Sequence, residues 1–226
     1  MPFSPYTDNG GTTLAVAGSD FCIVAGDTRQ SEGYSINSRY APKVFKLTGS
    51  AVLATGGMYA DATRLVSAIQ EKLEWFAFQH AHAPHAPGTL LNPAIAQMLS
   101  AMLYGKRFFP YYVWNTLGGI DSDGYLVNTG HGCVFSYDPV GNFERSYWNC
   151  TGSAGHLLQP FLDSQVGKHH QNIENPPTLS IQEALAIVKD AFTSAAERDI
   201  YTGDSAEIFI ITKDGVKLDR IMLKRD

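Results

Sequence analysis

The chain has 226 residues, of which 44% are hydrophobic and 17% charged, and its net charge is −5 at neutral pH. A chain of this length buries roughly 70% of its unfolded surface, so a single domain supplies its own core. The acidic balance without a basic stripe argues against a nucleic-acid partner. The sequence holds no run of 18 apolar residues, which argues against a membrane partner.

The first strand patterns follow a short arm. The opening "MPFSPYTDNGG" lacks the charged and apolar regions of a secretory signal, so we interpret residues 1–10 as an extended arm and 11–226 as a single domain. The segments "TTLAVAG" and "FCIVAGDTR", separated by "SD", predict a first hairpin. The segments "KVFKL" and "AVLATGG" around "TGS" predict a second hairpin.

Two helices are predicted next. Helical periodicity begins at Asp61, because apolar residues then recur every three or four positions on one face: Leu65, Ile69, Leu73 and Phe76. The segment "HAPHAPG" ends this helix, and a second one is predicted from Pro93 to Gly105. Its inward face consists of Ile95, Met98, Leu99 and Met102.

The second half of the chain repeats this order. "RFFPYYVWNTLGGID", "CVFSYD" and "FERSYWNC" are aromatic and β-branched, which predicts strands. A third helix is expected after Ser153, and a fourth after Ser180, which forms a capping box with Glu183. Leu185, Val188 and Phe192 supply the apolar face of the fourth helix. "EIFIITKDGVKLDRIML" predicts a closing hairpin over "KDG".

This order of elements favours one fold class. Pairs of helices alternate with groups of antiparallel strands, which is typical of a layered α+β domain. Two sheets packed face to face, with a helix pair outside each, would bury every apolar face named above. We therefore predict a four-layer αββα sandwich.

Several motifs resemble those of the proteasome β subunits in the N-terminal nucleophile hydrolase family. "GGTTLAVAG", "PKVFKL", "TGGMYAD", "TGSAG" and "ERDIYTGD" fall in that family's order and spacing across nearly the whole chain. The resemblance implies the αββα sandwich that is the fold of N-terminal nucleophile hydrolases. It also implies that the reaction of this family needs no cofactor. An active member cuts itself to expose an N-terminal threonine, whose hydroxyl attacks a peptide carbonyl while the free α-amine takes the proton.

The resemblance assigns a polar shell around that nucleophile. The residues that match it are Asp27, Lys43, Ser153, Asp199 and Thr202, the last standing where the family usually has a serine. Gly56 and Gly57 match the loop whose N–H groups stabilise the oxyanion. A lysine between two carboxylates is also a satisfied buried ion network, whether or not catalysis occurs, and its disruption would leave a buried charge unpaired.

The nucleophile itself does not match. Counting back from Asp27 without a gap, the family's catalytic threonine falls on Gly11, which has no side-chain oxygen. Thr12 could serve instead after cleavage of the preceding bond, which would make the chain an active N-terminal threonine endopeptidase. A one-residue slip in a strand turns the side chain to the opposite face, so Thr12 would need a bulge to restore the register. A homomeric protease ring built only of this chain would have no nucleophile.

Further stretches resemble one non-catalytic type of these β subunits. They are "FSPYTDNGGT", "INSRYAPKVF", "YGKRFFPYYV", "FSYDPVGNFER" and "PFLDSQVG", with departures in the predicted hairpin 121–133 and the loop 80–88. The resemblance implies a seven-membered β ring, an opposite β ring and α rings as partners, located in cytoplasm and nucleus. It makes the chain a wall of the chamber that shapes a neighbour's substrate groove, with Asp138 facing that neighbour's pocket; Asp before Pro-Val-Gly is also ordinary turn chemistry.

Other signals receive simpler interpretations. His80, His82 and His85 lie close in sequence without Cys or Asp, so we expect no metal site there, and His169 and His170 are similar. Lys106 and Arg107 precede aromatic residues that suit a subunit interface. The scattered Cys22, Cys133 and Cys150 predict buried thiols in a reducing compartment rather than disulfides.

Overall fold

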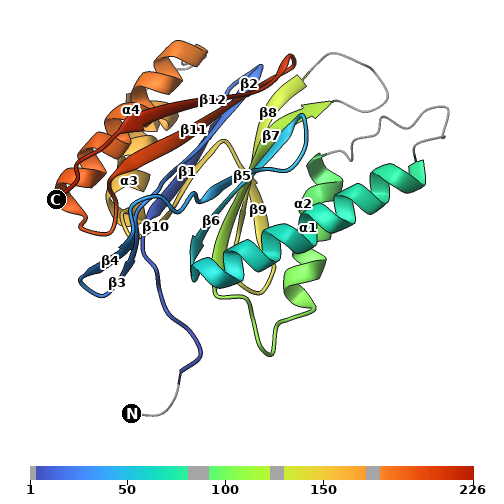
Figure 1. The fold of residues 1–226 in the computed structure, drawn as a ribbon. Helices are drawn as coiled ribbons and strands as arrows, with labels where there is room; N and C mark the ends of the chain where they lie inside the picture. The colour runs from blue at the N-terminus through green and yellow to red at the C-terminus, as the bar shows by residue number, and fades with distance from the viewer. Residues whose placement is uncertain (1–3, 81–91, 123–129, 172–178) are drawn as a thin grey trace.

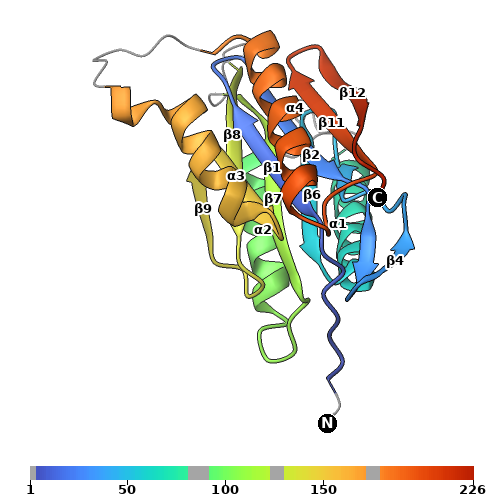
Figure 2. The same cartoon turned by 90° about the vertical axis from the view of Figure 1, so that its left-hand side faces the viewer.

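The computed structural model describes residues 4–80, 92–122, 130–171 and 179–226. Two five-stranded antiparallel sheets stack between two layers of helices, as the sequence predicts (Figure 1). One sheet has the strand order β10-β1-β2-β11-β12, and the other has the order β5-β6-β7-β8-β9. Viewed from the side of α3 and α4, these two helices cover the first sheet, and the N-terminal arm extends away below it (Figure 2).

The elements occupy the following residues. The strands are β1 (Thr12–Ala17), β2 (Phe21–Asp27), β3 (Gln30–Glu32), β4 (Ser35–Ser38), β5 (Val44–Lys46), β6 (Ala51–Gly57), β7 (Val113–Ser122), β8 (Gly130–Tyr137), β9 (Phe143–Ser146), β10 (Trp148–Gly152), β11 (Ser205–Thr212) and β12 (Gly215–Met222). The helices are α1 (Tyr59–His80), α2 (Asn92–Tyr104), α3 (Gly155–Leu162) and α4 (Ile181–Arg198). A π-helical turn (Asp163–Gly167) and a 3-10 turn (His169–Gln171) follow α3.

Three apolar clusters hold the layers together. One lies between the first sheet and α3 and α4 and contains Leu14, Val16 and Phe192. A second lies between the other sheet and α1 and α2 and contains Leu65, Ile69 and Leu99. A third lies between the two sheets and contains Ala15, Cys22 and Val24.

The alternation along β1 determines which way each side chain at the candidate site points. Leu14 and Val16 belong to the cluster under the helices, whereas Ala15 and Ala17 belong to the cluster between the sheets. Successive side chains on a strand point to opposite faces. Thr12 therefore shares the helix-side face with Leu14.

The helix signals were accurate to within two residues. Ser180 caps α4, its hydroxyl accepting from the Glu183 N–H while the Glu183 carboxylate accepts from the Ser180 N–H. The fourth helix buries Val188 and Phe192, with Leu185 packed against the same cluster. The first helix starts at Tyr59 instead of Asp61, because Ala62 N–H already bonds the Met58 carbonyl.

Three strand predictions were wrong in detail. The short hairpin of β3 and β4 was missed, because neither strand has an apolar alternation. The stretch 107–112 is a turn and an extended segment, and β7 starts only at Val113. The segment "FERSYWNC" forms two strands rather than one, since β9 joins one sheet and β10 the other, with Tyr147 between them. Most of the predicted longer hairpin 121–133, and the loop 81–88, lie outside the described residues.

Candidate functional site

An ion pair fills the space beside Gly11. Lys43 Nζ lies 3.0 Å from Asp27 Oδ1, and the two side chains are 4% and 0% exposed. Lys43 Nζ also donates to the backbone carbonyls of Asp27 and Arg29, at 3.3 and 2.5 Å. A Cβ placed on Gly11 would stand 2.2 Å from Lys43 Cε and 2.7 Å from Asp27 Oδ1. Gly11 has φ +87°, so a side chain there would also strain the backbone.

Asp27 organises the backbone around it. Its Oδ1 accepts from Thr12 N–H at 2.9 Å, and its Oδ2 accepts from the N–H groups of Arg29 and Gly203, both at 3.2 Å. Burial raises the pKa of the Asp27 carboxyl above its ordinary value, while the Lys43 ammonium and these N–H groups oppose the shift. The same carboxylate thus joins β2 to the start of β1 and to the loop before β11.

A second polar cluster lies on the helix side of β1. The Asp199 carboxylate accepts from the hydroxyls of Ser153 and Thr202, at 2.5 and 2.6 Å. Thr202 Oγ1 is 2.7 Å from Thr12 Oγ1, and Thr12 Oγ1 accepts from Ala154 N–H at 3.0 Å. Each hydroxyl has one proton, so Thr12 donates to Thr202, which donates to Asp199.

The prediction that a lysine lies between two carboxylates is therefore wrong. Lys43 is paired with Asp27, whereas Asp199 is partnered by two hydroxyls. The structure brings all five shell residues to the N-terminal end of β1, in two hydrogen-bonded groups. Lys43 is paired with Asp27, and the hydroxyls of Ser153 and Thr202 are bonded to Asp199.

The register of β1 opposes the Thr12 alternative. Pairing with β2 is continuous from Thr13 with Gly26 to Ala17 with Cys22, without a bulge. Thr12 points to the cluster around Thr202 and is fully buried, and its nitrogen is a peptide N–H bonded to Asp27. With the preceding residues attached, Thr12 has neither access to a substrate nor a free amine.

A buried ion pair that the sequence did not predict supports the loop carrying Asp199 and Thr202. Arg29 Nε lies 2.9 Å from Asp204 Oδ2, and both side chains are almost fully buried. Arg29 also donates to the Ile200 carbonyl at 2.8 Å. Asp204 adopts φ +68°, where aspartate is one of the few tolerated side chains. The dipeptide Gly203-Asp204, which is typical of a tight turn, was the sequence feature that could have indicated this loop conformation.

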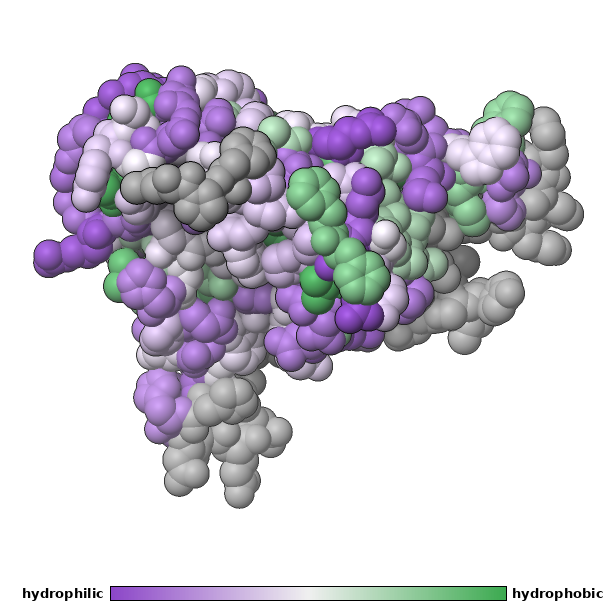
Figure 3. Space-filling model, turned by 90° about the horizontal axis from the view of Figure 1, so that it is seen from below, coloured by the Kyte–Doolittle hydropathy of each residue, from purple (hydrophilic) through white to green (hydrophobic). Residues whose placement is uncertain are grey.

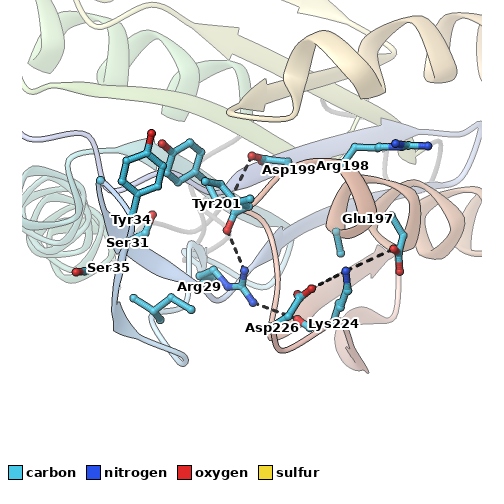
Figure 4. Close-up of a pocket in the computed structure, with 14 residues that line it drawn as sticks. Arg29, Ser31, Tyr34, Ser35, Glu197, Arg198, Asp199, Tyr201, Lys224 and Asp226 are labelled. Atoms are coloured by element: carbon cyan, nitrogen blue, oxygen red, sulfur yellow. Dashed lines mark hydrogen bonds and ion pairs between the residues drawn. The ribbon is translucent and has the colours of Figure 1, made fainter.

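A pocket of about 410 Å³ lies beside this loop, between the β3–β4 hairpin and the C-terminal end of α4. Figure 4 shows Arg29, Tyr34 and Tyr201 around it, with Lys224 paired to Glu197 and Asp226 on the far side. Charges of both signs line the pocket, so it has no single preferred ionic ligand. Ser31 and Asp199 also line it, which makes the pocket a neighbour of the candidate site.

Gly57, which the resemblance places in the oxyanion loop, bonds the N-terminal arm through its carbonyl. Its carbonyl accepts from Asn9 N–H at 3.2 Å. Gly57 has φ +107°, and a Cβ there would lie 2.5 Å from the Tyr112 carbonyl. Gly56 precedes it in β6 with open space at its Cβ position.

Asp138 lies apart from these residues, in the turn between β8 and β9. Its Oδ1 accepts from the N–H groups of Val140 and Asn142, at 3.0 and 2.8 Å. This is the ordinary turn chemistry of an aspartate before Pro-Val-Gly.

The remaining candidates have structural roles where they are described. His80 stacks on Phe76, His82 and His85 lie outside the described residues, the His169 side chain is not described, and His170 is exposed. Within the described part of the chain, no three His, Cys, Asp or Glu side chains are grouped to hold a metal, and no helix could cross a membrane. Lys106 and Arg107 lie in a turn, where each contacts an aromatic ring.

The three thiols are free and buried, as predicted. Burial raises the pKa of Cys133 to about 11 and that of Cys150 to about 12, and it raises the pKa of Cys22 as well. Such thiols stay protonated and inert at neutral pH.

Comparison with known proteins gives one consistent family. The sequence model of the family described as "Proteasome subunit" matches residues 7–211. The proteasome subunit beta type-1-B of Carassius auratus is 48% identical over 225 residues, covering 99% of this chain and 90% of that protein. The proteasome subunit beta type-1 of Danio rerio is similar to the same extent. The proteasome subunit beta type-6 of Saccharomyces cerevisiae is 44% identical over 232 residues, covering 99% of this chain and 92% of that protein.

Proposed function

The chain belongs to the proteasome subunit family, and we propose that it acts as a non-catalytic β subunit of the 20S core particle. Its work in protein degradation is then structural: it completes the ring and helps to enclose the chamber where active neighbours cut. Its partners are the other β subunits of the same ring, the opposite β ring and the α ring. It requires no cofactor and operates where the particle does, in cytoplasm and nucleus.

One observation carries the proposal. The position that an active subunit fills with threonine is Gly11, and Lys43 and Asp27 already fill the space of the missing side chain. Without a hydroxyl there, and with Thr12 buried on the other face of β1, no group is available to attack a peptide carbonyl. The polar shell persists because it serves the fold: Asp27, Asp199 and Asp204 together hold β1, β2 and the loop 199–204 in place.

The test is the intact mass of this chain, taken from its native particle after treatment with a covalent probe directed at N-terminal threonine. We expect an unlabelled chain that still begins before Gly11, while active subunits of the same particle gain the mass of the probe. A chain trimmed to Thr12 and carrying the probe would overturn the proposal and establish the endopeptidase alternative.

We further propose that Asp138 helps to shape the substrate pocket of the neighbouring active subunit. The Asp138 side chain accepts the N–H bonds of its own turn through Oδ1. An Asp138→Asn variant retains an oxygen for that turn and removes the negative charge. Its incorporation into the particle should alter the cleavage preference of one active site, measured with fluorogenic peptides of different charge, and an unchanged preference at every site would contradict this role.

A further inference from the structure

The sequence contains one Asn-Gly dipeptide, Asn9-Gly10, directly before the start of β1. Asparagine is a chemically labile residue, because the nitrogen of the next residue can attack its side-chain amide. Glycine makes this attack easiest, since its nitrogen carries no neighbouring side chain and its backbone is the most flexible. The dipeptide is therefore the most reactive asparagine site that the sequence offers.

The fold requires both residues of this dipeptide. Gly10 has φ +65°, and a Cβ on it would stand 2.8 Å from Tyr201 Cβ and 3.0 Å from Ser31 Oγ, so any side chain there is strained. Asn9 is 8% exposed, and its amide is bonded both as an acceptor and as a donor. Neither residue can be replaced by a less reactive one without the loss of native contacts.

Four hydrogen bonds hold Asn9 in one conformation. Its Oδ1 accepts from Tyr59 N–H at 2.9 Å, and its Nδ2 donates to the Ser31 carbonyl at 3.2 Å. Its main-chain N–H donates to the Gly57 carbonyl at 3.2 Å, and its carbonyl accepts from Ser31 N–H at 3.0 Å. Ring closure between the Gly10 nitrogen and Asn9 Cγ needs rotation of the Asn9 side chain and backbone, which these bonds oppose.

The arm is fixed a second time by Tyr6. The Tyr6 ring packs against Tyr112 and Phe109, with centroids 5.3 and 5.7 Å away, and its hydroxyl donates to the Pro110 carbonyl at 2.9 Å. Segments near a chain end that are held by so few contacts open locally, at a lower free energy than the core. The arm can thus be released while the sheets stay folded.

We propose that Asn9-Gly10 is a site of spontaneous deamidation, protected while the arm is bonded to Ser31, Gly57 and Tyr59 and reactive once the arm is released. The Gly10 nitrogen bonds to Asn9 Cγ, and the Cγ–Nδ2 bond breaks. The proton leaves the Gly10 nitrogen toward the Asp8 carboxylate, which accepts its hydrogen bond at 3.0 Å, and departs with the ammonia. Water then opens the five-membered imide at either carbonyl, giving aspartate or isoaspartate.

The reaction marks the chain permanently. Either product carries a negative charge and lacks the Nδ2 donor, so the Ser31 carbonyl loses its partner and faces a carboxylate oxygen. Isoaspartate also adds a carbon to the main chain, so that the bonds to Ser31 and Gly57 no longer fit one residue. A chain whose arm has been released for long enough can therefore not return the arm to its original position.

The experiment follows residue 9 in dilute full-length chains and in a peptide. The chains are the wild type, the release variant Tyr6→Ala, and the control Tyr147→Ala, which removes an exposed tyrosine away from the arm. The peptide has the sequence of residues 4–13, SPYTDNGGTT, and represents a fully released arm. After incubation at neutral pH, digestion and mass spectrometry measure the fractions of asparagine, aspartate and isoaspartate. Amide hydrogen exchange at Tyr59 reports whether the arm is bonded, and exchange in β2 reports whether the fold is intact.

We expect Asn9 in the wild type and in Tyr147→Ala to deamidate at least about tenfold more slowly than in the peptide, because the rate scales with the fraction of released arm. Tyr6→Ala should deamidate about tenfold faster than the wild type, with faster exchange at Tyr59. The variant Asn9→Asp, which has the charge of the product, should also expose the Tyr59 amide. Its control Asn142→Asp adds the same charge at an exposed position and should leave that amide protected.

Three results would overturn the proposal. The first is a wild-type chain that deamidates at Asn9 as fast as the peptide. The second is a Tyr6→Ala chain with an intact β2 and an exposed Tyr59 amide whose Asn9 stays unchanged. The third is an Asn9→Asp chain whose Tyr59 amide is as protected as in the wild type. If Tyr6→Ala instead keeps both the Tyr59 amide and Asn9 protected, the bonds of Asn9 alone are sufficient, which supports the proposal. None of these results depends on the catalytic state of the chain, which the probe experiment above tests separately.

Discussion

At Gly11, neighbouring side chains occupy the space that a side chain of this residue would need. The Lys43 side chain extends into the volume where a Cβ would lie, and the ammonium forms its ion pair with Asp27 there. Placing a threonine at Gly11 is therefore more than the addition of a hydroxyl, because the lysine would have to withdraw from a buried position. A buried charge moves at high cost unless its partner moves with it.

We predict that Gly11→Thr creates no efficient peptidase and destabilises the chain. The positive φ alone costs about 1–3 kcal/mol for a residue with a side chain, and the overlap with Lys43 adds to it. Urea unfolding of the dilute chain and a fluorogenic peptide assay measure the two effects. Gly33→Thr is the matched control, since Gly33 has φ +57° and open space around it, and should lose less stability. Strong peptide hydrolysis by Gly11→Thr would show that the shell is still functional.

The Asp27–Lys43 pair permits a second prediction at this scale. Lys43→Met leaves Asp27 buried without its partner, which should cost about 3–5 kcal/mol of unfolding free energy. The control is Arg64→Met, which removes an exposed ion pair with Glu71 at 3.8 Å and should cost at most about 1 kcal/mol. Equal losses in the two variants, measured by urea unfolding, would mean that the buried pair does not stabilise the fold.

At the scale of elements, the sequence predicted correctly those helices and hairpins whose positions depend on interactions between residues close in the chain. The capping box at Ser180 and the apolar stripe from Leu185 to Phe192 contain all the information needed to place α4, and the structure has them as expected. The two hairpins β1–β2 and β5–β6 were likewise readable from alternation and turn residues.

The change from one sheet to the other between β9 and β10 could not be predicted from the sequence, because the sheet that a strand joins depends on partners far away in the chain. Residues 143–146 pair with β8 and residues 148–152 pair with β1, more than a hundred residues earlier in the chain. The candidate site was predicted only in part for the same reason. Spacing placed Asp27, Lys43, Ser153, Asp199 and Thr202 together, but that Lys43 pairs with Asp27 and not with Asp199 appears only when both sheets are assembled.

The capping box gives a prediction about pH. Hydrogen bonds from the Ser180 backbone N–H and hydroxyl lower the pKa of Glu183 below its ordinary value. A carboxylate with a lowered pKa in the folded state contributes stability above its unfolded pKa and loses it as the pH falls through the folded value. In Ser180→Ala, an NMR titration should show the pKa of Glu183 rising. Ser194→Ala, an exposed serine inside the same helix, should leave it unchanged, and an equal shift in both variants would contradict the assignment.

At the scale of the whole molecule, large apolar side chains remain on the surface. Phe108 is 93% exposed and Phe78 is 75% exposed, with Trp75 and Phe109 also outside the core. Green hydrophobic side chains protrude from the lower face among purple polar ones (Figure 3). Exposed aromatic residues of this size indicate surfaces that bind other proteins, consistent with a subunit that is buried among neighbours.

We therefore predict that the isolated chain self-associates at high concentration. Sedimentation should show species larger than the monomer, and Phe78→Ser/Phe108→Ser should shift the population toward the monomer without loss of folding, because neither ring is in the core. Leu218→Ser, at a less exposed apolar position on β12, is the control and should change little. A wild-type chain that stays a monodisperse monomer at high concentration would argue against a ring subunit.

The strand order of the first sheet also determines how long β2 remains unpaired on one side while the chain is being synthesised. The central strand β2 pairs on one side with β11, which is made 178 residues after Asp27, at Ser205 and beyond. At a translation rate of about 5–20 residues per second, the edge of β2 waits roughly 10–35 seconds for its partner. Until then a hydrophobic strand with unpaired main-chain groups is open to other nascent chains. The long interval before β11 is made therefore leaves this edge of β2 as the place where pairing between incomplete chains is expected to begin.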